Sequence, residues 1–119
     1  MTGVQTCALP ISAHVGAAHG EALAAVLAEV MEFNEPTVNA IYASVANDMS
    51  LQNDARTAIN SVRDLADDIK IRFPLSTFGV QSDMCESIAN TVLTDSVTSN
   101  NPVDPTKDQV LEIIKSRLN

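Results

Sequence analysis

Residues 20–34, GEALAAVLAEVMEFN, contain the clearest secondary-structure signal in the chain. The larger apolar residues Leu23, Val26, Leu27, Val30 and Met31 recur every three or four positions, which is typical of a helix with one buried face. The interspersed alanines have high helix propensity and allow close packing. We therefore predict a helix over 20–34 that ends at Glu35-Pro36, because the residue before a proline disfavours helical backbone angles.

The same apolar spacing recurs in four further segments, at about 36–49, 52–70, 82–93 and 106–118. In the 52–70 segment we expect an inward face that includes Leu65 and Ile69. Ser82 is suited to cap the fourth helix, and Thr106 with Gln109 has the pattern of a capping box before the fifth. No segment alternates apolar and polar residues over the length of a strand. The predicted fold class is all-α, with about five helices.

Length and charge limit the classes of protein to which the chain can belong. Its 119 residues suffice for one small domain. The net charge of -8 argues against a nucleic acid or an anionic membrane as partner, and we expect neither. No apolar run is long enough to cross a bilayer. With Cys7 set aside, as explained below, Cys85 has no partner for an intrachain disulfide, so we expect a cytoplasmic location.

The first residues differ in character from the rest of the chain. Residues 1–11, MTGVQTCALPI, resemble a translated short-read sequencing adapter, and we expect native sequence to resume between Ser12 and Ala13. A secretory signal is the alternative, but the segment lacks a basic start and a long apolar stretch. We therefore expect residues 1–12 to be an artefactual adapter-derived segment and residues 13–119 to be a truncated helical metal-binding domain.

Several short phrases in the remaining sequence occur in the order found in one enzyme family. They are His19-Gly20-Glu21-Ala22-Leu23, Val30-Met31-Glu32-Phe33-Asn34, Pro74-Leu75 with Phe78-Gly79-Val80, Thr94-Asp95, Asn101-Pro102 and Pro105-Thr106. Together they resemble the C-terminal domain of the iron-containing (group III) alcohol dehydrogenases, whose fold is dehydroquinate synthase-like. Two positions depart from the family pattern, since Ala18 replaces a common proline and Val103 replaces a frequent arginine.

The resemblance implies an oxidoreductase that moves hydride between a small alcohol or aldehyde and NAD(P), with Fe(2+) or another divalent metal as Lewis acid. The intact parent is then expected to be a homo-oligomer. Of the family's metal ligands, His19 matches the last. The position fourteen residues earlier is Gln5, and the further active-site histidine ten residues earlier is replaced by Leu9. We therefore expect no catalytic or cofactor-binding residues here, one metal ligand, His19, and an inactive fragment that binds neither metal nor NAD(P) tightly.

Other candidate sites have simpler explanations. His14 lies five residues before His19, which is not a helical ligand spacing. Asp64, Asp67 and Asp68 fit a solvated helix face, and Cys85 has no neighbouring base to activate its thiol.

Two alternative functions stay open from the sequence. One is a free-standing, non-catalytic helical binding or scaffold domain, which predicts that every apolar face is covered, whereas a fragment exposes an apolar patch. The other is a relative such as a maleylacetate reductase or a glycerol dehydrogenase, which would share the fold and differ in metal and substrate.

Overall fold

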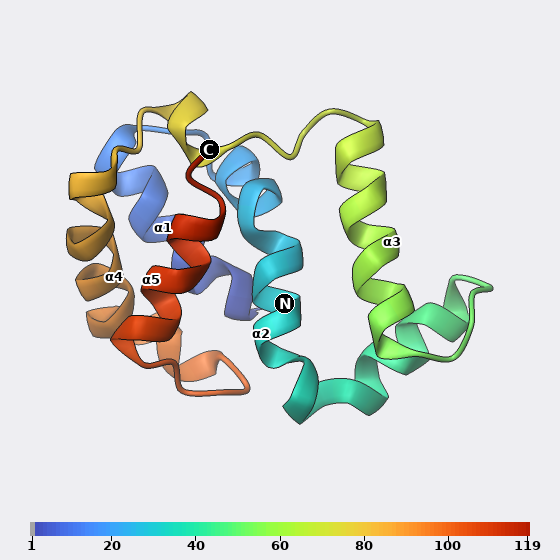
Figure 1. Cartoon of the computed structure of the whole chain (residues 1–119). Coiled ribbons are helices and arrows are strands. Elements are labelled where there is room, and N and C mark those ends of the chain that lie inside the picture. The colour runs from blue at the N-terminus through green and yellow to red at the C-terminus, as the bar shows by residue number, and fades with distance from the viewer. Residues whose placement is uncertain (1) are drawn as a thin grey trace.

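The computed structural model describes residues 2–119, with side chains from residue 8 onward, and is built from helices (Figure 1). Its α-helices are α1 (Thr2–Val15), α2 (His19–Asp48), α3 (Ala55–Asp68), α4 (Cys85–Thr94) and α5 (Lys107–Ser116). Short 3-10 helices η1 (Leu75–Phe78), η2 (Ser82–Met84) and η3 (Ser96–Asn100) connect them. The described part contains no strand, which confirms the all-α prediction. None of the described helices has the length and apolarity needed to cross a membrane.

Helix α2 consists of two helical segments that meet at a kink, so the two helices predicted over 20–49 are present, but the break lies at Val38 and not at Glu35-Pro36. At this kink Val38 takes non-helical angles of φ -119° and ψ 24°. Pro36 removes one backbone donor and crowds the preceding turn, which kinks a helix that its neighbours otherwise support. The two helices predicted over 20–49 are therefore two halves of one bent helix, visible at the bottom of Figure 1.

The main hydrophobic core is formed by α1, the first half of α2, α4 and α5. Its largest fully buried side chains include Ile11 from α1, Val26 from α2, Ile88 from α4 and Ile114 from α5. Helix α1 was not among the helices expected from the sequence, yet it contributes Ala8 and Ile11 to this core.

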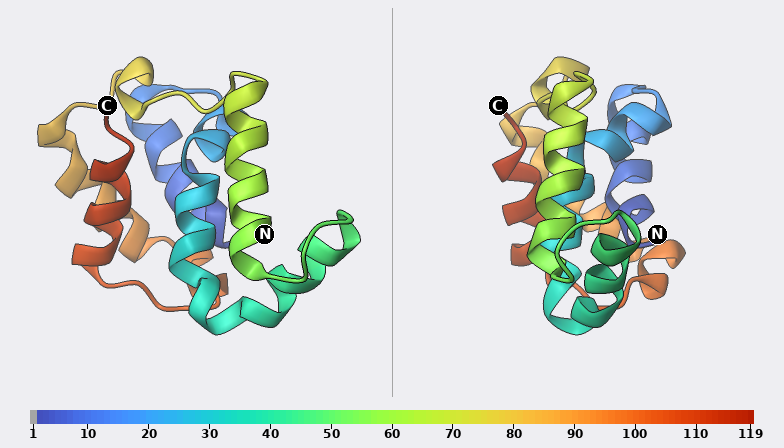
Figure 2. Two further views of the ribbon diagram at one scale, coloured as in Figure 1. Left: turned by 45° about the vertical axis from the view of Figure 1, so that its right-hand side comes forward. Right: turned by 90° about the vertical axis from the view of Figure 1, so that its right-hand side faces the viewer.

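Helix α3 lies at one side of the molecule and packs mainly against α2 (Figure 2). Asp54 caps its first turn by accepting a hydrogen bond from the Thr57 backbone N–H at 2.8 Å. Its buried face consists of small residues and one large one, Ala55, Ala58, Ile59 and Ala66. Leu65 and Ile69, expected to face inward, are both 55% exposed. A single neighbouring helix covers a narrower stripe than the apolar pattern of α3 spans, and the inward assignment of these two residues is wrong.

The ends of α4 and α5 illustrate two different local signals. Thr106 and Gln109 form the predicted capping box, in which each side chain bonds the other residue's backbone N–H. Ser82, expected to cap α4, instead begins η2, and α4 starts at Cys85 without a side-chain cap. At the far end of α5, the Leu75 and Ser76 N–H groups donate to the carbonyls of Arg117 and Leu118 at 2.7 and 3.0 Å.

Candidate functional site

His19, the one residue proposed as a metal ligand, is the first residue of α2, and its side chain is exposed. Ala18 precedes it in extended conformation and provides no side-chain cap. Among the residues whose side chains the structure describes, no group of three or more His, Cys, Asp or Glu could hold a metal ion. Leu9, on α1, is an apolar residue with no donor atom. The side chains that are described therefore do not fit a metal centre, since tight binding needs several converging donors.

His14 is engaged in hydrogen bonds between two helices. Its Nδ1 lies 2.8 Å from the Pro10 carbonyl oxygen and its Nε2 lies 3.2 Å from the Ser87 hydroxyl on α4. Because a carbonyl only accepts, Nδ1 carries the proton, and in the neutral ring Nε2 accepts from Ser87. His14 thus helps to join α1 to α4, which gives it a structural role.

The contacts of the remaining candidates from the sequence are also explained by a structural role. The side chains of Asp64, Asp67 and Asp68 are exposed, and Asp67 forms an ion pair with Arg72 at 3.5 Å. Cys85 is fully buried in the core, where its thiol lies 3.7 Å from the Gln81 carbonyl oxygen. A buried thiol in these surroundings behaves as a small apolar residue.

The sequence did not reveal a buried charged cluster formed by Glu29, Arg72 and Arg117. Arg117, 9% exposed, donates from Nε to the Ala25 carbonyl at 2.9 Å and from Nη2 to the Arg72 and Phe73 carbonyls, each at 3.2 Å. Glu29 pairs with Arg72 and lies 3.9 Å from the Arg117 Nε. Burial lowers the pKa of Arg117 below its usual value, and the Arg72 charge lowers it further, whereas Glu29 and Asp67 act in the opposite direction. The cluster ties α5 to α2 and to the segment after α3.

A second buried polar group joins two of the phrases that carry the family resemblance. The amides of Asn34 and Asn101 exchange hydrogen bonds at 2.9 and 2.8 Å, and Asn101 also donates to the Val103 carbonyl. Asn34 additionally hydrogen-bonds the Tyr42 hydroxyl. Burial raises the pKa of Tyr42, and the bond from Asn34 partly offsets that rise. These four residues connect the bend of α2 to the loop before α5.

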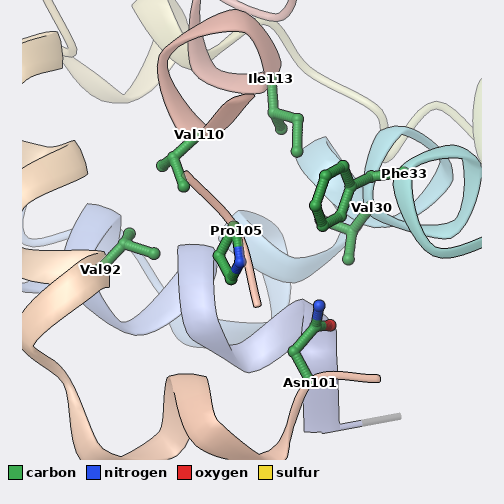
Figure 3. Close-up of a pocket in the computed structure, with 7 residues that line it drawn as sticks. All are labelled: Val30, Phe33, Val92, Asn101, Pro105, Val110 and Ile113. Carbon is green, nitrogen blue, oxygen red and sulfur yellow. The ribbon is translucent and has the colours of Figure 1, made fainter. Parts of the chain in front are cut away.

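Two hollows accompany these polar groups. A small cavity of about 10 Å³ is lined mainly by apolar side chains, with Asn101 as its one polar side chain (Figure 3). A groove of about 360 Å³ between α2 and α5 is lined by Glu29, Glu32, Phe33, Gln109, Glu112, Ile113 and Ser116. Two of its three carboxylates, those of Glu29 and Glu32, form ion pairs with arginines.

Comparison with known proteins gives a consistent result. Residues 2–118 match the model of the Fe-containing alcohol dehydrogenase family, C-terminal. Alcohol dehydrogenase 4 of Schizosaccharomyces pombe is 29% identical over 118 residues, which cover 97% of this chain and 28% of that protein. Choline dehydrogenase of Bacillus subtilis is 30% identical over 94 residues, which cover 73% of this chain and 23% of that protein. The solved structure of a 1,3-propanediol oxidoreductase superposes with a TM-score of 0.88 at 24% identity, over 96% of this chain and 32% of that one. The chain therefore spans less than a third of the length of these relatives.

Proposed function

Since the chain belongs to the Fe-containing alcohol dehydrogenase family, as its C-terminal helical domain, we propose that it derives from an NAD(P)-dependent and metal-dependent alcohol dehydrogenase and is itself inactive. The observation that carries the second part of the proposal is the set of residues at the family's ligand positions. His19 occupies one of them and Gln5 stands at another, where a histidine is expected, while Leu9 stands at the position of a further active-site histidine. A single exposed imidazole cannot provide the closed set of ligands that a tightly held divalent ion requires.

In the intact parent we propose that His19 completes a metal site between this helical domain and a nucleotide-binding domain. The metal would supply Lewis-acid polarisation of the alcohol or aldehyde oxygen during hydride transfer. The role of His19 in this chain is limited to presenting its imidazole at the N-terminus of α2, where Glu21 lies in the same first turn. We also propose a small alcohol or aldehyde as the parent's substrate, NAD(P) as its cofactor, a homo-oligomeric assembly and a cytoplasmic location.

The exposed apolar residues support an origin in a larger protein. Most of the large apolar residues that are exposed belong to the second half of α2, to α3 or to the loops next to α3, namely Ile41, Val45, Met49, Leu51, Leu65, Ile69, Ile71 and Phe73. A free-standing scaffold domain was expected to cover its apolar faces within the chain. The exposure of these residues disfavours that alternative, as does the family match.

Activity and metal binding test the proposal separately. The purified chain, assayed with NAD+ or NADP+ and simple primary alcohols in the presence of Fe(II), Zn(II) or Ni(II), is expected to form no reduced nicotinamide above background. A full-length family member assayed in parallel shows that the conditions permit turnover. Detectable turnover by this chain would refute the proposed inactivity.

Calorimetric titration with the same metals is expected to give weak binding. The His19→Ala variant is the matched control, because a lone surface imidazole adds little to metal affinity. Submicromolar binding that is lost in His19→Ala would contradict the single-ligand interpretation and reveal a site that the described side chains do not form.

A further inference from the structure

We propose that residues 39–71 form an arm that opens and closes as a unit on the rest of the domain. This proposal does not rest on the proposed function. The arm comprises the second half of α2, the following loop, α3 and the residues just after it. The body comprises α1, the first half of α2, η1, α4 and α5. The arm lies at one side of the body in Figures 1 and 2.

The arm contributes nothing to the main hydrophobic core. Every buried residue of that core belongs to the body, in the ranges 8–30 and 75–114. The apolar residues that the arm does bury are mostly alanines, Ala46, Ala55, Ala58, Ile59 and Ala66. Since hydrophobic stabilisation scales with the apolar area that a side chain buries, these alanines contribute less of it than the isoleucine, valine and leucine side chains of the main core. Regions with few buried apolar contacts open at lower free energy than the global transition.

Each end of the arm is marked by a residue with non-helical backbone angles. At its start, Val38 interrupts the helical angles of α2. At its end, Lys70 has a positive φ of 59° in the C-terminal cap of α3, where the Lys70 and Ile71 N–H groups donate to the Asp67 and Ala66 carbonyls at 3.1 and 3.0 Å. Just beyond this cap, Arg117 in the body holds the carbonyls of Arg72 and Phe73. Changes of backbone angle at these two places would move the arm without disturbing the core.

Polar side chains supply the contacts that hold the arm closed. Glu32 on the first half of α2 forms ion pairs with Arg56 at 2.8 Å and with Arg63 at 2.9 Å, and both arginines lie on α3. Tyr42 in the arm is hydrogen-bonded to Asn34 in the body. Ion pairs at partly exposed sites weaken as salt screens them, so the closed arm should depend on ionic strength more than the body does.

Native-state hydrogen exchange followed by mass spectrometry on the full chain tests the proposal. We expect amides of α3 and of residues 39–48 to exchange together, and faster than those of α4 and α5. Glu32→Gln removes both ion pairs and should accelerate arm exchange between about three- and about tenfold while leaving the body unchanged. Glu86→Gln is the matched control, because it breaks an exposed ion pair with Lys107 within the body and should leave the arm unchanged.

Tyr42→Phe removes only a hydroxyl and provides a second, milder variant that should also accelerate exchange in the arm alone. In the unmodified chain, raising NaCl from about 0.01 M to about 1 M shortens the Debye length from about 30 Å to about 3 Å and should accelerate the arm selectively. Equal exchange in arm and body, or equal acceleration of both by Glu32→Gln, would overturn the proposal. Separate exchange of the arm that neither variant nor salt changes would overturn the assignment of the polar contacts that hold it closed.

Discussion

Replacing Arg117 by methionine removes a buried guanidinium while keeping a side chain of similar length. The substitution deletes three hydrogen bonds to the carbonyls of Ala25, Arg72 and Phe73 and one of the charges facing Glu29. Bonds from a charged donor contribute about 1.5–3 kcal/mol each. Two effects reduce the total. Water can replace the donor at the Phe73 carbonyl, because Phe73 is exposed, and removing the Arg117 charge removes the cost of burying that charge. We therefore expect a net loss of about 3 kcal/mol, at the lower end of the range for breaking a buried pair.

Urea and thermal unfolding followed by far-UV circular dichroism measure this loss. For a domain of this length, about 3 kcal/mol corresponds to a fall of about 10–15 °C in Tm. Arg56→Met is the matched control, since its guanidinium is 54% exposed and makes one ion pair, so it should cost less than about 1 kcal/mol. If Arg117→Met costs no more than Arg56→Met, the buried cluster does not stabilise the fold and the reasoning fails.

Three further perturbations test other parts of the structure. Ile11→Ala should lower the free energy of unfolding in urea by about 2–5 kcal/mol, because Ile11 is fully buried. Leu9→Ala, on the same helix but 39% exposed, should lower it much less. Equal losses for the two variants would exclude α1 from the core. Burial raises the folded-state pKa of Tyr42 above 10.0, so the neutral Tyr42 hydroxyl stabilises the fold fully below that pH, and this stabilisation is lost as the pH rises through the folded-state pKa. Because phenylalanine does not ionise, alkaline unfolding of Tyr42→Phe should begin at higher pH than that of the unmodified chain. Identical alkaline unfolding profiles would refute the assignment. Asn34→Ala and Asn101→Ala should each lower the free energy of unfolding by about 1–3 kcal/mol, and the double variant should lose clearly less than the sum of the two. Strict additivity in this double-mutant cycle would show that the two amides are not coupled.

Local signals in the sequence were sufficient to predict helices in the regions of α2 to α5 and one of the caps, but they did not lead to α1. The capping box of Thr106 and Gln109 involves residues three apart, so the sequence contains all the information it needs. The apolar spacing of α3 correctly predicted a helix, but it could not tell which part of the stripe a neighbour would cover. Leu65 is exposed because α2 reaches only the alanine side of that stripe.

Features that depend on distant residues were not predictable. Pro36 indicated an interruption, but whether a helix ends or bends there depends on what packs against its second half. The partners of Arg117 lie 92, 45 and 44 residues away along the chain, and no short pattern indicates such contacts. The unbroken apolar context of Glu29 is the one signal that could have marked it as a buried charge in need of a partner.

The resemblance located His19 and Gln5, but it did not predict that the segment containing Gln5 and Leu9 would form a helix. Residues 1–12 were set aside because of their adapter-like sequence, although α1 packs into the core through Ala8 and Ile11. Packing depends on the shape and apolarity of side chains and is independent of where the coding sequence came from. The proposal that this segment is foreign therefore concerns its origin, and its structural role is a separate question.

The carbonyls of Arg117 and Leu118 accept hydrogen bonds from the start of η1, which leaves Asn119 as the one residue beyond this pairing. Chain ends ordinarily fray and are trimmed by exopeptidases. Carboxypeptidase digestion of the native domain should therefore stall after asparagine is released, and its progress would report on global unfolding. An affinity tag fused at this end needs a flexible spacer so that it does not pull these last residues away from η1.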